Sequence, residues 1–130
     1  MRYVPLIGRI LYSLIFILSG FGHFANLGQM AGYAASKGVP LPQVAVIVTG
    51  IMILLGGISI LVGYKPKIGS LLLLIFLIPT SFIMHNFWAI SDPMQSQIQM
   101  IMFMKNLSMA GGALLIYYFG TGPIGLEGQE

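Results

Sequence analysis

Cysteine is absent from the sequence, and charged residues are scarce, with six lysines and arginines and three acidic residues in 130 positions. Without cysteine the chain forms no disulfide, thiolate metal site, iron–sulfur cluster or covalent haem attachment. Any electron transfer would need a borrowed or noncovalent cofactor. Six cations are too few for a nucleic-acid-binding surface, so we expect no nucleic-acid partner.

Hydrophobic residues, in contrast, make up 57% of the sequence, which leaves too little polar surface to keep the chain soluble. Four apolar stretches, at about 3–24, 43–63, 68–87 and 98–119, each approach the ~20 residues that cross a hydrocarbon layer as a helix. They lack the alternation typical of membrane-barrel strands. We therefore predict an all-α fold, an integral membrane four-helix bundle in a single domain of residues 1–130. The glycine-rich tail, 120–130, is expected to be loosely held.

The connections between these stretches differ in length. The first is long, and Leu27, Met30, Ala31 and Ala34 recur in it at helical spacing, which predicts a short helix at the membrane interface. The second, at 63–67, is a tight turn that predicts a helical hairpin.

The positions of the cations predict an orientation in the membrane. Arg2 and Arg9 begin the first helix, and Lys65 and Lys67 lie in the turn two spans later, so all four belong to the same side. Because cations accumulate on the cytoplasmic side, we expect both termini to be cytoplasmic. The protein is then a multi-pass protein of the cell membrane.

Helical periodicity of ~100° per residue predicts which side chains face inward. On the first helix the inward stripe is Arg9, Ser13, Phe16, Gly20 and His23. On the third helix the stripe is Ser70, Ser81 and His85. On the fourth it is Gln95, Gln99, Asn106, Ala110 and Ala113.

The two histidines of the chain, His23 and His85, are predicted to lie at similar depth near the outer end of the bundle. Imidazoles at equal depth could ligate a haem b, and the methionines of the last helix could hold copper(I). The histidines lack other support, and the methionines spread around their helix as ordinary apolar packing residues do. We therefore expect no metal site, and favour hydrogen bonding of the histidines to a quinone or to the helix ends.

Lys105 lies inside the fourth stretch, where a cation costs about 2.5–3.5 kcal/mol on insertion scales. Three interpretations remain open from the sequence. The ammonium could extend to the outer headgroups, pair with Asp92, or bind an anionic ligand.

The end of the third helix brings polar and aromatic residues to the outer side, which predicts a pocket there. The expected ligand-binding residues are His23, His85, Asn86, Trp88, Lys105 and Asn106. The expected supporting residues are Arg9, Ser19, Ser81 and Asp92. No catalytic residue is assigned.

The segments RILYSLIFILSGFGHF, YAASKGVPLP, GIMILLGGISILVGYKPKIGSLLLLIFLIPTSFIMHNFW and MFMKNLSMAGGALL together resemble the DoxX family of small four-helix membrane proteins. The resemblance covers nearly the whole chain. It implies association with membrane redox or thiol-stress complexes, because the family is named after a subunit linked to archaeal thiosulfate:quinone oxidoreductase. It supplies no established catalytic residues.

These features favour a redox-associated membrane subunit whose outer pocket binds a quinone headgroup or a small anion. We expect no intrinsic cofactor, with quinone as the ligand. Besides the lipid bilayer, a hetero-oligomeric membrane or redox partner is expected, with a homo-oligomer as the other option. The alternative function is a noncatalytic scaffold or assembly partner that packs through glycine-rich faces. A small transporter is disfavoured, because the sequence lacks a paired set of interrupted helices.

Overall fold

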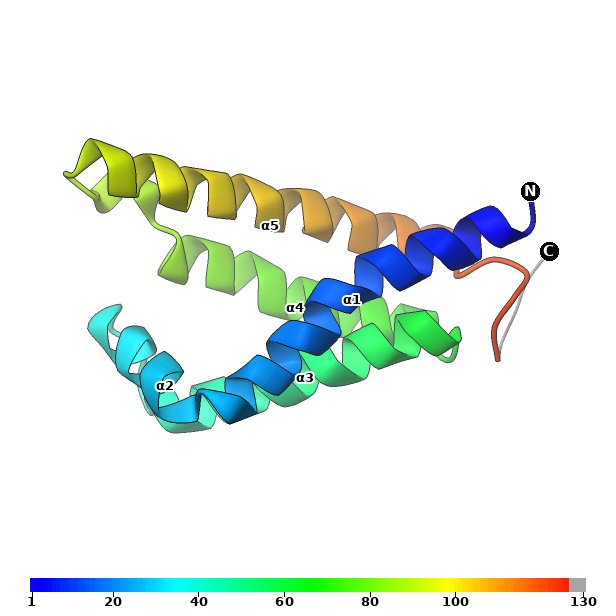
Figure 1. Cartoon of the computed structure of the whole chain (residues 1–130), viewed down its shortest axis with the longest axis horizontal. Coiled ribbons are helices and arrows are strands. Elements are labelled where there is room, and N and C mark those ends of the chain that lie inside the picture. The colour runs from blue at the N-terminus through cyan, green and yellow to red at the C-terminus, as the bar shows by residue number, and fades with distance from the viewer. Residues whose placement is uncertain (127–130) are drawn as a thin grey trace.

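The computed structural model describes residues 1–126 and is helical throughout its regular structure (Figure 1). The elements are α1 Tyr3–Ala25, α2 Leu27–Ser36, α3 Pro42–Val62, α4 Pro66–Met84, the 3₁₀-helix η1 Phe87–Ala89 and α5 Pro93–Phe119. Four segments are long and apolar enough to cross a membrane, namely α1, α3, α5 and Pro66–Ala89. The predicted all-α membrane bundle is confirmed, and the short helix predicted in the first connection is α2.

Two helix boundaries differ from those predicted. Helix α4 ends at Met84, three residues before the predicted end, so His85 and Asn86 lie in a non-helical link before η1. Helix α5 begins at Pro93 instead of about residue 98, because the Asp92 carboxylate caps it by accepting a hydrogen bond from the Gln95 backbone N–H at 3.0 Å.

The spanning helices form an open row in the order α1, α3, α4, α5 (Figure 1). Neighbours in this row pack along one another, whereas α1 and α5, at its two ends, diverge toward the end of the molecule that carries α2. Close packing of α3 on α4 depends on Gly56, where an added Cβ would lie 2.9 Å from the Gly69 carbonyl oxygen.

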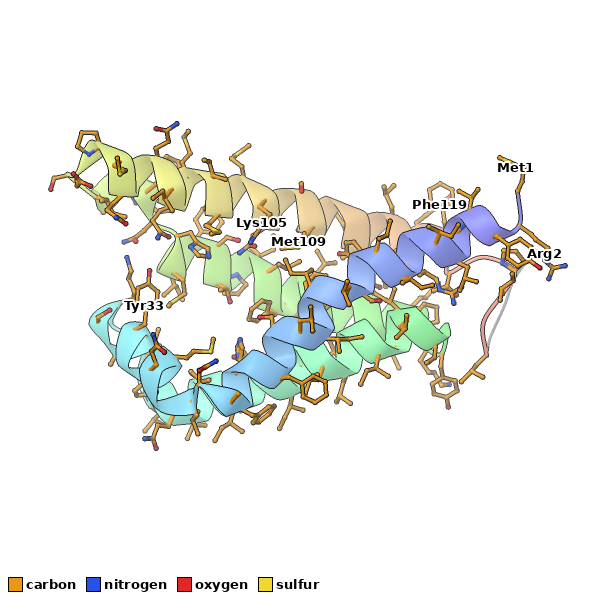
Figure 2. All side chains as sticks on the ribbon, viewed as in Figure 1. Met1, Arg2, Tyr33, Lys105, Met109 and Phe119 are labelled. Atoms are coloured by element: carbon orange, nitrogen blue, oxygen red, sulfur yellow. The ribbon has the colours of Figure 1, made fainter. Side chains whose placement is uncertain are left out.

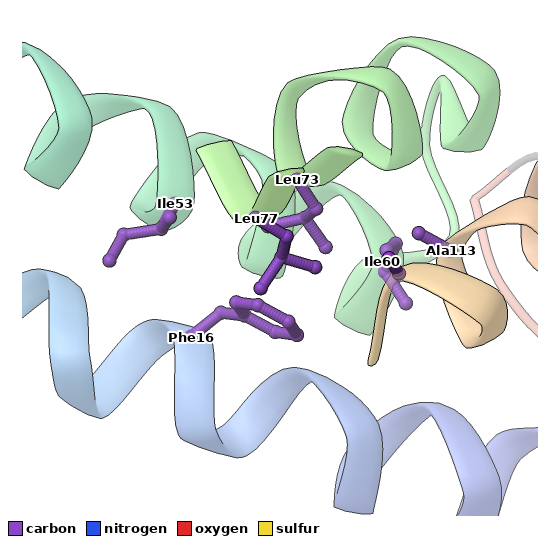
Figure 3. Close-up of a cluster of buried hydrophobic side chains, with 7 residues drawn as sticks. Phe16, Ile53, Ile60, Leu73, Leu77 and Ala113 are labelled. Atoms are coloured by element: carbon purple, nitrogen blue, oxygen red, sulfur yellow. The ribbon is translucent and has the colours of Figure 1, made fainter. Parts of the chain in front are cut away.

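The apolar core lies where the helices of the row meet (Figure 3). Its buried members are Phe16, Ile53, Ile60, Leu73, Leu77, Ala110 and Ala113. Phe16 extends from α1 toward α3 and α4, while Ala113 brings α5 into the same cluster. The core therefore holds the row together at mid-bundle and leaves the α2 end more open.

The predicted inward stripes agree with the buried residues to different degrees on α1, α4 and α5. On α1 the buried residues are Arg9, Ser13, Phe16, Gly20 and His23, so that stripe is confirmed. On α4 Ser70 and Ser81 are buried, and on α5 Asn106, Ala110 and Ala113 are buried. Three expected members differ: Gln95 is exposed, Gln99 is half-buried, and His85 lies beyond the end of α4.

Arg9 anchors the segment that follows α5. Its Nη1 donates to the carbonyl oxygens of Thr121, at 2.9 Å, and Ile124, and its Nη2 donates to the Leu61 carbonyl at 3.0 Å. The Leu126 backbone N–H also donates to the Val62 carbonyl at 2.9 Å. Residues 121–126 of the tail that was predicted to be loose are therefore joined to the helices by hydrogen bonds, while 127–130 lie outside the described residues.

Candidate functional site

A cavity of about 670 Å³ occupies the α2 end of the bundle, within the range of small-molecule sites. All five α-helices contribute to its lining, and most of its wall is apolar, including Phe16, Met30, Val46, Ile53 and Phe76. Polar side chains are few and lie on different helices. An apolar cavity with a few convergent polar groups is typical of a ligand site.

His23 brings an imidazole from α1 into this cavity, and its side chain is only 5% exposed. Its Nδ1 lies 3.0 Å from the Val46 carbonyl oxygen and 3.3 Å from Thr49 Oγ1. Because a carbonyl oxygen only accepts, Nδ1 carries the hydrogen in the neutral ring, and Nε2 is left with a lone pair. Nε2 makes no hydrogen bond to the described part of the chain, so it is available to a ligand in the cavity.

Asn106 supplies a second buried polar group, from α5. Its side chain is 6% exposed and lines the cavity. Within residues 1–126 its carboxamide forms no hydrogen bond, although it offers two donors and an acceptor. Of the described residues, Arg9 Nε and Thr121 Oγ1 are the side-chain atoms that are fully buried without a hydrogen-bond partner, so the Asn106 carboxamide is accessible from the cavity. A ligand there can use its donors and its acceptor.

Lys105 lies beside Asn106 on the side of α5 that borders the cavity (Figure 2). It is exposed, and its Nζ lies 3.5 Å from Met102 Sδ. Asp92 caps α5 instead of pairing with Lys105, and the described residues hold no ion pair between the two. The structure therefore does not show the pairing of Lys105 with Asp92, which was one of the three interpretations of this lysine.

His85 reaches the cavity from the link that follows α4. Its Nδ1 lies 2.7 Å from the Gln99 carboxamide oxygen on α5, which only accepts, so Nδ1 donates. The two histidines thus line one cavity at the same end of the molecule, as predicted, and each ring is oriented by a protein oxygen.

Five of the ten predicted site residues line the cavity: Ser19, His23, His85, Lys105 and Asn106. Asn86 instead accepts a hydrogen bond at 2.9 Å from Lys37, which joins the end of α2 to the end of α4. Trp88 is 57% exposed and packs against Phe82, Phe87 and Phe103.

Three of the expected supporting residues act elsewhere. Ser81 donates to the Leu77 carbonyl within α4 at 2.6 Å, and Asp92 caps α5. Arg9 is separated from His23 by fourteen positions of α1, about 21 Å of helical rise, and does not line this cavity.

Sequence reasoning missed several polar residues of the cavity wall. Tyr33, Thr49, Gln29 and Thr80 line the cavity but were not among the predicted site residues. Tyr33 lies on α2 and faces the end of α4, where its hydroxyl is 3.5 Å from the Met84 carbonyl oxygen (Figure 2). The available clue was that Thr49 follows Val46 by three residues, which puts both on the same side of α3, where both contact His23.

Comparison with known proteins gives a consistent set of relatives. A family model described as DoxX matches residues 4–86. Inner membrane protein YphA of Escherichia coli (strain K12) is 34% identical over 94% of this chain and 86% of its own length. Inner membrane protein YqjF of the same organism is 31% identical over 94% of this chain and 88% of its own length.

A more distant similarity is to the ER-derived vesicles protein ERV29 of Saccharomyces cerevisiae (strain ATCC 204508 / S288c). The two proteins are 28% identical over an aligned region that covers 63% of this chain but only 26% of the yeast protein. No solved structure gives a significant match.

Proposed function

This chain belongs to the DoxX family of membrane proteins, and from that premise we propose that it binds the headgroup of a quinone or quinol in the cavity beside His23. The observation that carries this proposal is that two side chains of low exposure, His23 through Nε2 and Asn106 through its carboxamide, have unused hydrogen-bonding capacity in a mostly apolar cavity. Such groups at two positions suit a flat, apolar ring with a polar atom at each end.

The polarity of these groups favours a quinol over a small anion. His23 Nε2 presents a lone pair, which attracts a hydroxyl donor and repels an anionic oxygen. A quinol hydroxyl can donate to Nε2, while Asn106 and Lys105 can donate to the oxygen at the other end of the ring. Lys105 would attract an anion in the cavity, but the lone pair of His23 Nε2 would repel it.

A redox role would need a partner. Interconversion of a quinone and a quinol moves two electrons and two protons, and this cysteine-free chain offers hydrogen bonds and a proton acceptor at His23. We therefore propose that the electrons pass to or from a partner protein at the membrane, with this chain as the quinone-binding subunit.

Lys105→Met tests whether the lysine serves the ligand. Because the lysine makes no ion pair with a described residue and a cation within a span is costly, the melting temperature in detergent should stay equal or rise. Affinity for the quinone menadione should fall about five- to tenfold with the loss of one charged donor. Lys67→Met is the matched control, because it removes the same charge beside Tyr117, outside the cavity, and should leave affinity unchanged.

Unchanged menadione affinity in Lys105→Met would remove the lysine from the site. A lower melting temperature that Asp92→Asn restores would instead favour pairing of the two side chains.

We also propose that the α2 end of the molecule lies outside the cytoplasm and that both termini are cytoplasmic, because Arg2, Arg9, Lys65 and Lys67 gather at the opposite end. Single cysteines in place of the exposed Ser36 and Ser91 should react with an impermeant maleimide added to intact cells or right-side-out vesicles. The cysteine-free chain supplies its own unlabelled control. Labelling from the cytoplasmic side alone would contradict this orientation.

A further inference from the structure

The two end helices of the row, α1 and α5, diverge toward the α2 end (Figure 1). We call the space between them the seam and assign to it the cavity residues Ile15 and Ser19 of α1 and Lys105 and Met109 of α5, of which the α5 pair can be followed in Figure 2. All four of these residues line the cavity. Ile15, Ser19 and Lys105 are exposed, so the cavity extends to the outer surface of the bundle at the seam.

Two contacts between helices border the cavity at the two ends of the seam. Toward the termini, Tyr12 bridges the seam, since its hydroxyl donates to the Met109 carbonyl and its ring packs where an added Cβ on Gly112 would lie 2.8 Å from Cε1. At the far end, α2 is held near α4 by the hydrogen bond from Lys37 to Asn86. The seam is therefore a lateral opening between these two contacts.

The seam faces lipid if the helices span the membrane. It lies within the spans Tyr3–Ala25 and Pro93–Phe119, and the faces of these helices that point away from the bundle carry exposed apolar side chains, such as Leu18 at 63% and Met104 at 56%. Exposed apolar side chains along a span belong in the hydrocarbon layer. A molecule passing through the seam would therefore come from the bilayer and not from water.

We infer that the cavity admits a lipid-tailed quinone or quinol laterally from the bilayer, with the ring beside His23 and Asn106 and the apolar tail lying in the seam between α1 and α5. This inference rests on the proposed function. The side chains of His23 and Asn106, with unused hydrogen-bonding groups, select the headgroup, and Ile15 and Met109 give the opening an apolar border for the tail.

Two naphthoquinones test the inference, because menaquinone-4 carries an isoprenoid tail and menadione has the same ring system without the tail. Saturation binding is measured in nanodiscs, with the quinone expressed as a mole fraction of lipid. Ile15→Trp places a large ring in the seam from α1, and Met109→Trp does so from α5. Leu18→Trp is the matched control, since Leu18 lies on α1 but does not line the cavity.

Both blocking variants should lose at least about tenfold in menaquinone-4 affinity and change menadione affinity by less than about twofold, because the substitutions fill the tail path alone. Leu18→Trp should bind both quinones as the wild type does. Thermal unfolding of each variant in the same nanodiscs checks that it is folded, and two different blockers guard against the failure of one.

Equal effects on the two quinones, or no effect of either blocker on menaquinone-4, would overturn lateral binding while leaving the headgroup site in place. Phospholipid retained in the wild type and not displaced by menaquinone-4 would overturn it too. If the wild type binds neither quinone, the proposed function itself fails.

Discussion

His23→Phe should weaken binding of menadiol, the reduced form of menadione, at least about tenfold, equivalent to about 1.4 kcal/mol. The reason is that phenylalanine removes the Nε2 lone pair that accepts the quinol hydroxyl. Affinity for menadione itself should fall less, because a quinone carbonyl does not donate to Nε2. Both affinities are measured by anaerobic equilibrium binding, with dithionite present for menadiol.

A structural role for His23 can be separated from a binding role. The Val46 carbonyl also accepts from Thr49 Oγ1 at 3.2 Å, so loss of the imidazole does not leave it unpaired. His23→Asn keeps an N–H close to the position of Nδ1 and removes Nε2. If menadiol affinity survives in His23→Asn but the melting temperature falls in His23→Phe, His23 is a packing residue and the proposed contact is wrong.

Arg9→Met should lower the free energy of unfolding by about 2–4 kcal/mol, because three backbone carbonyls near this buried side chain lose a charged donor. The segment after α5 should detach and become sensitive to carboxypeptidase. Menadione binding should persist in the folded fraction, since Arg9 lies near the opposite end of α1 from His23.

Arg2→Met is the matched control for this change. Arg2 is exposed and makes no side-chain cap at the start of α1, so the same loss of charge should alter stability by less than about 0.5 kcal/mol. Arg9→Lys should fall between the two, because one ammonium cannot serve three carbonyls spread around a guanidinium. Unchanged protease resistance in Arg9→Met would show that other contacts hold the tail.

Much of the fold was predictable because a membrane restricts the options. Apolar runs of span length had to be helices, and the polar residues of α1 had to point inward. This placed Ser13 and His23 correctly, together with Phe16 on the same stripe. The position of α2 also followed from spacing alone. These predictions concern single helices, for which periodicity along the chain is sufficient.

The arrangement between helices was not predictable in the same way. Periodicity gives each helix a face but does not say which helices are neighbours, so the open row and the separation of α1 from α5 had no sequence signal. The early end of α4 turned Asn86 and Trp88 away from the cavity. Likewise, glycines after α5 suggested a loose tail, because nothing local reveals that Arg9 binds its carbonyls.

Native mass spectrometry of the chain purified in mild detergent from quinone-containing membranes tests quinone binding most directly. We expect one quinone or quinol bound per wild-type chain, and its loss in His23→Asn while the purified variant retains the wild-type melting temperature. A wild-type chain that carries phospholipid but no quinone, or equal quinone occupancy in His23→Asn, would contradict a quinone site at His23.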